Sequence, residues 1–447
     1  MSTVAEQANI QQKIDSNFEI LENNLNGTRK WPIHQIRKNA LTILKETGLP
    51  GLKHEEYKYS HIAKALEKHF NFQHQSQPYI GNIEDYTHLL YRGDEIINLT
   101  FVNGQFVQEL SNVHDQEGIN ILEFSEAYKK HQEKIDAHFA HYAKVEADAF
   151  IALNTSFAEK GAFIEIEDNK IIEKPVFINF ITDSTKGEVV SYPRNLFIAG
   201  KNTQASIVER YLNLGEEPSF VNSVTEAVVY ENAILNHYLI EREGDNSYHV
   251  ATTQINQVEK SFVNCYAVSL SGAMVRNNLN LVLDAENCES NMFGIYLLNG
   301  KTHVDNHTMV DHRKPNSVSN ELYKGIMDDN STGVFNGKIF VRKYAQKTNA
   351  FQSNKNIVMS NNASINTKPQ LEIWADDVKC SHGCTTGQLN TDQIFYLQSR
   401  GISEQRAKAI LLYAFVNDIV SKISLENIRE NIQKTITERL HVDLGVN

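Results

Sequence analysis

Residues 224–240, VTEAVVYENAILNHYLI, contain the pattern that decides the fold. Two short runs of β-branched, aliphatic and aromatic residues, Val224–Tyr230 and Ala233–Ile240, flank Glu231-Asn232, a pair typical of a turn. Gly and Asn residues separate further runs of the same kind between about residue 151 and about residue 378. We therefore predict that this whole region consists of short strands and turns. Its other clear runs are Ala205–Tyr211, Leu279–Leu283, Val334–Arg342 and Asn356–Met359.

Many short strands can form a sandwich, a barrel or a β-helix. One uninterrupted β region of this length, rich in Asn and Ser, favours stacked coils. In such a solenoid no coil buries its own apolar face, so adjacent coils must stack, and Asn at the corners can carry hydrogen bonds from coil to coil. No repeat of fixed length is visible in the sequence. The residues alone therefore predict a mainly β fold with a β-helix at its centre.

Helices are expected on both sides of this region. Before about residue 150 apolar residues recur at spacings of three and four, as in Asn39–Leu44. One strand-like segment, Ile96–Val102, leads into Asn103-Gly104, a strong turn signal, and predicts a hairpin within this part. We divide the chain into a helical N-terminal domain with a short hairpin at 1–150, a β-helix core at 151–389 and a helical C-terminal domain at 390–447.

The C-terminal part shows the start signals of three helices. Asn390 or Thr391 is a candidate N-cap for a helix through Gln393–Leu397, and Ser403 is a candidate N-cap for the next. A final amphipathic segment spans Ser424–Leu440. The second helix, Glu404–Ser421, is expected to bury an apolar face made of Ala407, Ile410, Leu411, Ala414, Phe415 and Ile419.

Composition and charge exclude several classes of function. The 43 basic and 55 acidic residues give a formal net charge of −12, which disfavours nucleic acid and anionic membrane surfaces as partners. Apolar stretches are far shorter than the roughly 20 residues of a membrane span. The polar N-terminus with Glu6 lacks the pattern of a secretory signal, so a cytoplasmic location is expected. The four cysteines are too sparse for a disulfide framework and are expected to be reduced.

One loop-like segment places three potential metal ligands close together in sequence. Cys380, His382 and Cys384 alternate with other residues, so an extended backbone would point all three to one side. Thiolate sulfur and imidazole nitrogen both bind iron or zinc. The spacing by itself also allows the alternative that the cysteines are small buried hydrophobic residues and that His382 is a hydrogen-bonded core residue.

Longer segments of the chain carry a family resemblance. Together they resemble the SufB/SufD scaffold family of iron–sulfur cluster assembly, specifically its SufD branch. The matching segments are Asp376–Gly383 (DDVKCSHG) followed by Thr385, Gln393–Ile402, His303–His312, Ser319–Ile326, and Gly48-Leu49-Pro50 with Glu55–Tyr59.

The resemblance implies a right-handed parallel β-helix between helical domains. It implies a SufB-like partner subunit, a SufC-like ATPase bound through the C-terminal helices, and a transient iron–sulfur cluster formed where two β-helices meet. An isolated sample could instead form a homodimer. No phosphate-binding Gly-rich motif occurs, so this chain is expected to be a scaffold subunit that binds no nucleotide itself and is not an enzyme.

Carried over position by position, His382 matches the important histidine of the SufD branch and Cys380 the adjacent cysteine. Both are assigned to cluster assembly and, with Cys384, to metal binding. Cys384 departs from the family pattern, in which a small residue such as Ala is commoner. SufB-type chains have a key cysteine near the place where Ser353 and Asn354 stand, and its absence here implies that further ligands come from another chain.

Other candidate residues are given structural roles. His303, His307 and His312 are expected to form a polar surface or ladder, although His303 and His307 could share one face with Asp305 between them. Cys265 and Cys288 are expected to be inert buried thiols. The alternative function from a different class is a cytosolic β-helix carbohydrate lyase or hydrolase, with Asp305, Asp311 and Asp328 as its acidic groups.

Overall fold

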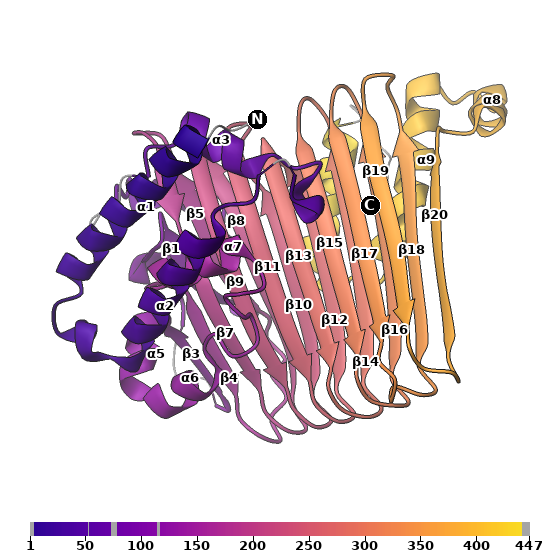
Figure 1. Cartoon of the computed structure of the whole chain (residues 1–447). Helices are drawn as coiled ribbons and strands as arrows, with labels where there is room; N and C mark the ends of the chain where they lie inside the picture. The colour runs from indigo at the N-terminus through magenta and orange to yellow at the C-terminus, as the bar shows by residue number, and fades with distance from the viewer. Residues whose placement is uncertain (1–3, 52, 73–77, 114–116, 440–447) are drawn as a thin grey trace.

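The computed structural model describes residues 4–51, 53–72, 78–113 and 117–439 of the 447-residue chain. Its central body is a flattened parallel β-helix, as predicted (Figure 1). From β8 onward, successive strands alternate between two strand assemblies, here named sheet A and sheet B. Because each strand pairs with the strand two places along the chain, every coil stacks on the coil before it.

Sheet A contains the even-numbered strands from β8 onward, together with β1, β2 and β5. In spatial order its members are β2 (Gln105–Phe106), β1 (Ile97–Val102), β5 (Val176–Asp183), β8 (Gln204–Leu214), β10 (Ile234–Arg242), β12 (Phe262–Ser271), β14 (Glu289–Leu298), β16 (Val318–Met327), β18 (Asn349–Val358) and β20 (Lys379–Gly387).

Sheet B contains the odd-numbered strands from β7 onward, together with β3, β4 and β6. In spatial order its members are β19 (Ser364–Ile373), β17 (Thr332–Val341), β15 (His303–His312), β13 (Met274–Leu283), β11 (Ser247–Gln257), β9 (Ser219–Val229), β7 (Arg194–Ala199), β4 (Ala162–Ile166) and β3 (Ile119–Glu123), with β6 (Val189–Ser191) also paired to β9.

The register of the strands explains why no repeat is visible in the sequence. Phe262 of β12 pairs with Glu289 of β14, whereas Val318 of β16 pairs with Asn349 of β18. The coil that starts at β16 therefore contains more residues than the coil that starts at β12. The strands have an almost constant length, so the additional residues of the longer coils lie in the turns at the corners. A fixed-period motif therefore cannot form, although the pairing itself is regular and parallel.

Apolar side chains fill the space between the two sheets. Leu235 and Val263 of sheet A and Leu281 and Val310 of sheet B belong to this central cluster. On the outside of sheet A, a ladder of asparagines links successive coils, with Asn264, Asn291 and Asn320 each donating to the Asn of the preceding coil at 2.9, 3.1 and 3.0 Å. Asparagine thus connects coils along a flat face as well as at corners, where Asn232 donates to Asn202.

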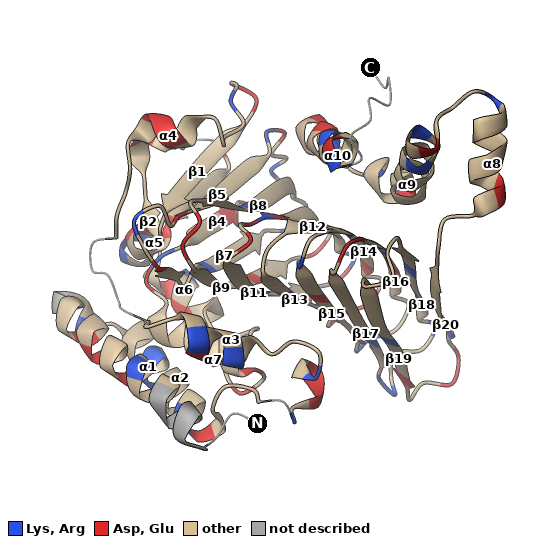
Figure 2. Cartoon of the chain, turned by 90° about the horizontal axis from the view of Figure 1, so that it is seen from above, with Lys and Arg blue, Asp and Glu red and all other residues tan. Residues whose placement is uncertain are grey.

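Helices cover both outer faces of the β-helix, and Figure 2 shows the two groups on opposite sides. The N-terminal group packs on sheet B, where Phe150 contacts Phe220 with ring centroids 6.3 Å apart. It comprises α1 (Val4–Asn24), α2 (Pro32–Thr47), α3 (Ile62–His69), α5 (Phe124–Lys130), α6 (Gln132–His138) and α7 (Ala149–Phe157), with 3₁₀ turns η1 (Asn26–Lys30) and η2 (Glu55–Tyr57). Two short elements, α4 (Ile83–Thr87) and η3 (Gln108–Leu110), instead pack on sheet A next to β1, β5 and β8.

The C-terminal group consists of α8 (Thr391–Ser399), α9 (Glu404–Val420) and α10 (Glu426–Arg439), of which α9 and α10 pack on sheet A. The Asn390 side chain caps α8, and the Ser403 side chain caps α9, as predicted. The buried face of α9 differs from the expected one, because Ile410, Leu411 and Phe415 are only partly buried and Ala414 is exposed. The face that contacts the sheet consists of Ala407, Ala409, Leu412, Val416, Ile419 and Val420.

The predicted hairpin is present, but it belongs to sheet A of the β-helix and not to a separate helical domain. Asn103 and Gly104 both have positive φ, 48° and 78°, which suits the tight turn between antiparallel β1 and β2. However, β1 also pairs in parallel with β5 and therefore extends sheet A of the solenoid. Among the described residues, no helix is long and apolar enough to cross a membrane.

Glycine and tyrosine interlock in adjacent coils near the middle of sheet A. Gly294 of β14 pairs with Tyr323 of β16, and Tyr296 pairs with Gly325 two residues further on. A Cβ atom on Gly294 would lie 2.1 Å from the Tyr323 ring, and one on Gly325 would lie 2.0 Å from the Tyr296 ring. Each glycine therefore leaves the space that the neighbouring buried tyrosine fills.

We expect Gly294→Ala to destabilise the protein by about 1–3 kcal/mol, because the added methyl group overpacks the core. The midpoint of urea unfolding measures the change. The matched control is Gly383→Ala, since a Cβ at Gly383 meets nothing within 4 Å. An equal midpoint for both variants would contradict the interlocked packing.

Candidate functional site

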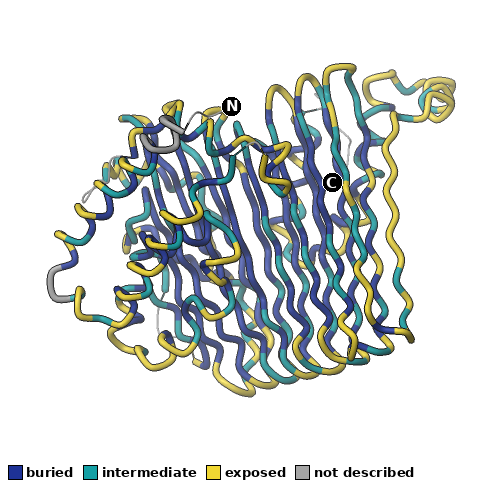
Figure 3. The backbone as a smooth tube through the Cα atoms, viewed as in Figure 1, coloured by how far each residue is buried: buried dark blue, intermediate teal, exposed yellow. Residues whose placement is uncertain are grey.

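The last coil of the β-helix consists of β19 and β20, which end their respective sheets. Neither strand has a further strand beyond it in the part of the chain that the structure describes. The tube in Figure 3 changes from mostly buried in the central coils to mostly exposed along β20. This coil, named the open end below, carries all three residues of the predicted ligand segment: Cys380, His382 and Cys384 lie on β20.

Cys380 is the most protected of the three. It is partly buried and packs with Ala350, Leu371 and Val378 at the edge of a small apolar cluster. Burial raises the pKa of the Cys380 thiol, because a low-polarity environment disfavours the thiolate. The free thiol is therefore held protonated until a metal or a cationic group lowers that pKa.

Cys384 and His382 are exposed. The Cys384 sulfur lies 3.4 Å from Thr367 Oγ1 of β19, so this side chain faces across the interior towards the opposite sheet. Strand alternation places His382, midway between the two cysteines, on the same face. Successive side chains on one face are about 7 Å apart along a strand. In the described residues no group of three Cys, His, Asp or Glu side chains is close enough to hold a metal ion.

Register shows which residues accompany the ligand segment. Cys380 pairs with Ala350, His382 with Gln352 and Cys384 with Asn354 on β18. Asn354 is one of the two positions near which SufB-type chains were expected to carry a cysteine. Sequence reasoning did not single out Gln352 or Thr367. The signal for Gln352 is its place one full coil before His382, which only the register reveals.

A buried polar group lies directly behind Gln352. Gln352 Nε2 donates to Glu321 Oε2 at 2.7 Å, and Thr308 donates to the other oxygen of the same carboxyl group. Glu321 is 4% exposed, and burial raises its pKa to about 7. The interior next to the open end thus contains a buried, hydrogen-bonded carboxyl group, as the more central coils do at Glu209 and Glu241.

The three histidines of β15 do not gather around a common centre. His303 contacts Ser60 at 2.8 Å, and His307 contacts Asp305 at 3.0 Å and Glu56 at 3.4 Å. His312 lies on the interior side and contacts Ser319 at 2.9 Å. His303 and His307 therefore fasten the N-terminal segment to sheet B, which agrees with a structural role.

The three acidic residues considered for a carbohydrate lyase or hydrolase lie in different parts of the structure. Asp305 is buried and pairs with Arg276 at 2.8 Å, while Asp311 is buried and pairs with Arg342 at 2.6 Å. Asp328 lines a different hollow, of about 290 Å³, beneath the C-terminal helices. A pair of free carboxyl groups in one groove, which glycoside hydrolysis needs, is not formed by these three residues.

The remaining thiols are buried within the core. Cys265 and Cys288 are each 1% exposed, and burial raises the pKa of both. The four cysteines are all free in the structure. The expectation of inert thiols at these two positions fits their burial.

The fold and the candidate site define a parallel β-helix protein whose exposed last coil carries thiol and imidazole groups. The family model of the SUF system FeS cluster assembly, SufBD core domain, matches residues 180–415, and that of the SufBD protein N-terminal region matches residues 8–178. The chain therefore belongs to the SufBD family of iron–sulfur cluster assembly proteins.

Curated relatives are similar in sequence to this protein along almost its whole chain. An iron–sulfur cluster assembly SufBD family protein of Synechocystis is 30% identical over 439 residues, covering 96% of each chain. The iron–sulfur cluster assembly protein SufD of Escherichia coli is 31% identical over 418 residues, covering 93% of this chain and 94% of its own. The chain is thus similar to SufD proteins throughout the β-helix and its flanking helices.

We expect thiol alkylation of the native protein to follow exposure, with Cys384 first, Cys380 more slowly, and Cys265 and Cys288 only after unfolding. Burial both hides a thiol and disfavours its reactive thiolate. Mass spectrometry of iodoacetamide-treated peptides over time measures the order, and urea-unfolded protein is the control in which all four react. Alkylation of Cys265 in native protein as fast as that of Cys384 would contradict this placement.

Proposed function

We propose that the chain is a SufD-type scaffold subunit that supports cluster formation at the open end of its β-helix. The observation that carries the proposal is the position of Cys380, His382 and Cys384 on β20, the exposed last strand of sheet A. The transient iron–sulfur cluster is the cargo of this site and is shared with a partner subunit. The subunit acts in the cytoplasm as an assembly component, with no catalytic residue and no nucleotide of its own.

The partner that fits the open end is a second β-helix, here a SufB-like subunit. Unpaired strand edges tend to bind other strands, so β19 and β20 offer hydrogen-bonding groups to a partner. A partner placed there would cover His382 and Cys384 and bring its own ligands, which are needed because the described residues hold no complete set. In the absence of that partner, the same edges can pair two copies of this chain.

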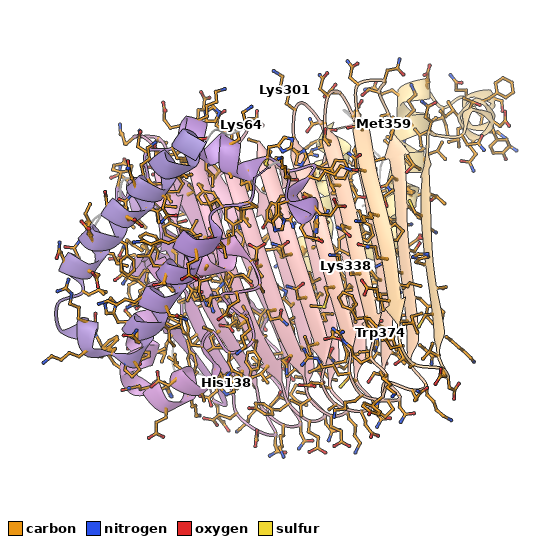
Figure 4. The ribbon with its side chains drawn as sticks, viewed as in Figure 1. Lys64, His138, Lys301, Lys338, Met359 and Trp374 are labelled. Atoms are coloured by element: carbon orange, nitrogen blue, oxygen red, sulfur yellow. The ribbon has the colours of Figure 1, made fainter. Side chains whose placement is uncertain are left out.

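Aromatic side chains beside the open end support its use as an interface. Trp374, which follows β19, is 49% exposed and lies near the lower end of the last coils (Figure 4). Its ring stacks on Phe340 with centroids 6.3 Å apart, and the Arg342 guanidinium lies 5.2 Å from its centroid. Trp and Arg are enriched at protein interfaces, where they contribute large contact areas.

His382 and Cys380 are the residues assigned to cluster assembly, with Cys384 as an additional metal ligand. The exposed imidazole of His382 can bind iron through a ring nitrogen or donate a hydrogen bond to sulfide or thiolate. Cys380 supplies a supporting thiol from its partly buried position.

The C-terminal helices are the proposed docking site for a SufC-like ATPase. Helix α8 buries none of its residues, and Phe395 and Tyr396 on it are 72% and 57% exposed. Figures 1 and 2 show α8 projecting beyond the β-helix, while α9 and α10 lie against sheet A. Exposed aromatic residues on a projecting helix are typical of a binding surface.

His382→Ala is expected to abolish cluster formation in the complex of this chain with its SufB-like and SufC-like partners. The chain loses its exposed imidazole, while the fold is unaffected because His382 supports no packing. Anaerobic reconstitution measures the loss by visible absorption and iron content, with Ser381→Ala, on the opposite face of β20, as the matched control. Normal cluster formation by His382→Ala in an intact complex would place the site elsewhere.

Replacing Phe395 and Tyr396 together by Ala is expected to weaken binding of the SufC-like ATPase by at least about tenfold, because exposed aromatic anchors dominate such interfaces. Calorimetric titration of the ATPase into the purified chain measures the affinity. Ile171→Ala is the control, since Ile171 is 67% exposed near the other end of the solenoid. Unchanged affinity in the double variant would exclude α8 as the docking helix.

A further inference from the structure

A column of residues inside the β-helix leads from a buried carboxyl group to His382. On sheet A, Glu321, Gln352 and His382 pair in register on β16, β18 and β20. On sheet B, Thr308, Gly337 and Pro369 pair in the same way on β15, β17 and β19. The two columns face each other, because Thr308 donates a hydrogen bond to Glu321 across the interior.

Gly337 allows the Gln352 side chain to occupy its position. A Cβ atom on Gly337 would lie 2.3 Å from Gln352 Nε2 and 2.8 Å from its Cδ. The Gln352 amide group therefore fills the space opposite a residue without a side chain. In the next coil Pro369 takes the corresponding place opposite His382, and its ring offers no hydrogen-bonding group.

The nitrogen of the Gln352 side-chain amide forms a hydrogen bond within the interior, whereas its oxygen forms none among the described residues. Its Nε2 donates to the Glu321 carboxyl group at 2.7 Å, which fixes the orientation of the amide. Its Oε1 is buried, and among the described residues nothing donates a hydrogen bond to it. Gln352 is 3% exposed, and leaving a buried acceptor unpaired costs free energy. The next residue of the column is His382, which carries a ring N–H that could be donated.

We propose that Gln352 is the positioning residue of His382: its amide oxygen accepts the N–H of one ring nitrogen and so leaves the lone pair of the other nitrogen available to iron. Paired positions on adjacent strands are about 4.8 Å apart, so a rotation of the exposed imidazole brings a ring nitrogen within reach of Oε1. A metal-bound histidine usually donates its second ring N–H to such an acceptor, which fixes its tautomer.

Glu321 holds Gln352 in this orientation from behind. With both carboxyl oxygens engaged by Thr308 and Gln352, the group anchors the amide rather than contacting the cluster itself. This arrangement of Glu321, Gln352 and His382 extends the proposed function. Only the role of the second ring nitrogen of His382 as an iron ligand rests on that function. The fixed tautomer of His382, which this arrangement predicts, can be tested without iron.

The test is the tautomer of His382 in the full chain labelled with ¹⁵N-histidine, read from long-range ¹H–¹⁵N spectra at about pH 8.5, where a free imidazole is neutral. The His382 signals are identified by their loss in His382→Ala. One tautomer is expected to dominate in wild type and in the exchange variant Glu321→Gln with Gln352→Glu, which keeps an amide–carboxyl hydrogen bond and an acceptor at position 352. Gln352→Leu, which removes the acceptor at similar volume, is expected to give averaged nitrogen shifts from mixed tautomers.

Asn354→Leu is the matched control, because Asn354 is a similarly buried amide on the same strand but pairs with Cys384. It is expected to leave the His382 tautomer unchanged. The proposal is overturned if wild type shows no dominant tautomer, if folded Gln352→Leu keeps the wild-type tautomer, or if both leucine variants change it alike.

Cluster reconstitution in the complex provides the second readout. Gln352→Leu is expected to lower iron affinity by about 10–100-fold, the usual effect of removing such an acceptor, whereas the exchange variant Glu321→Gln with Gln352→Glu is expected to keep the wild-type affinity. A His382→Ala variant that still forms clusters would refute the proposed function of His382. The tautomer result would remain informative in that case, so the two failures are distinguishable.

Discussion

The structure depends on one constraint: a coil of a β-helix can bury its inner face only against another coil. In-register parallel pairing satisfies this from one coil to the next, and apolar residues of both sheets fill the centre. At the last coil the constraint is no longer met within the described part of the chain. The polar, exposed β20 and the partly buried β19 follow from this. The proposed assembly site lies on this exposed coil rather than in an enclosed pocket.

The same constraint makes the interior unusually informative about the site. A parallel register places residues of equal position in successive coils side by side, so each interior column extends to the open end. Apolar columns such as the one through Leu235 and Val263 stabilise the stack. The column through Glu321 and Gln352 instead carries hydrogen bonds, and it ends at His382. The interior thereby connects folding to the chemistry expected at the edge.

The flanking helices depend on the solenoid for their arrangement. The local start signals at Asn390 and Ser403 are correct predictions, because each cap is formed by neighbouring residues. The predicted buried face of α9 is right only for Ala407 and Ile419, since Leu412 and Val416 rather than Leu411 and Ala414 meet sheet A. An apolar stripe on a helix allows several rotations, and the surface that it packs on selects one.

The sequence by itself determined the fold class, the family and the residues of the ligand segment. Strand texture, turn residues and the DDVKCSHG segment are local patterns, and local physics or family resemblance suffices to interpret them. Only the tertiary structure decided which residues accompany His382. Gln352 lies a full coil earlier and becomes its neighbour through register, and Thr367 meets Cys384 across the interior. Because the corners give the coils unequal lengths, the pairing of distant positions cannot be counted along the sequence. It is set by the stacking of complete coils.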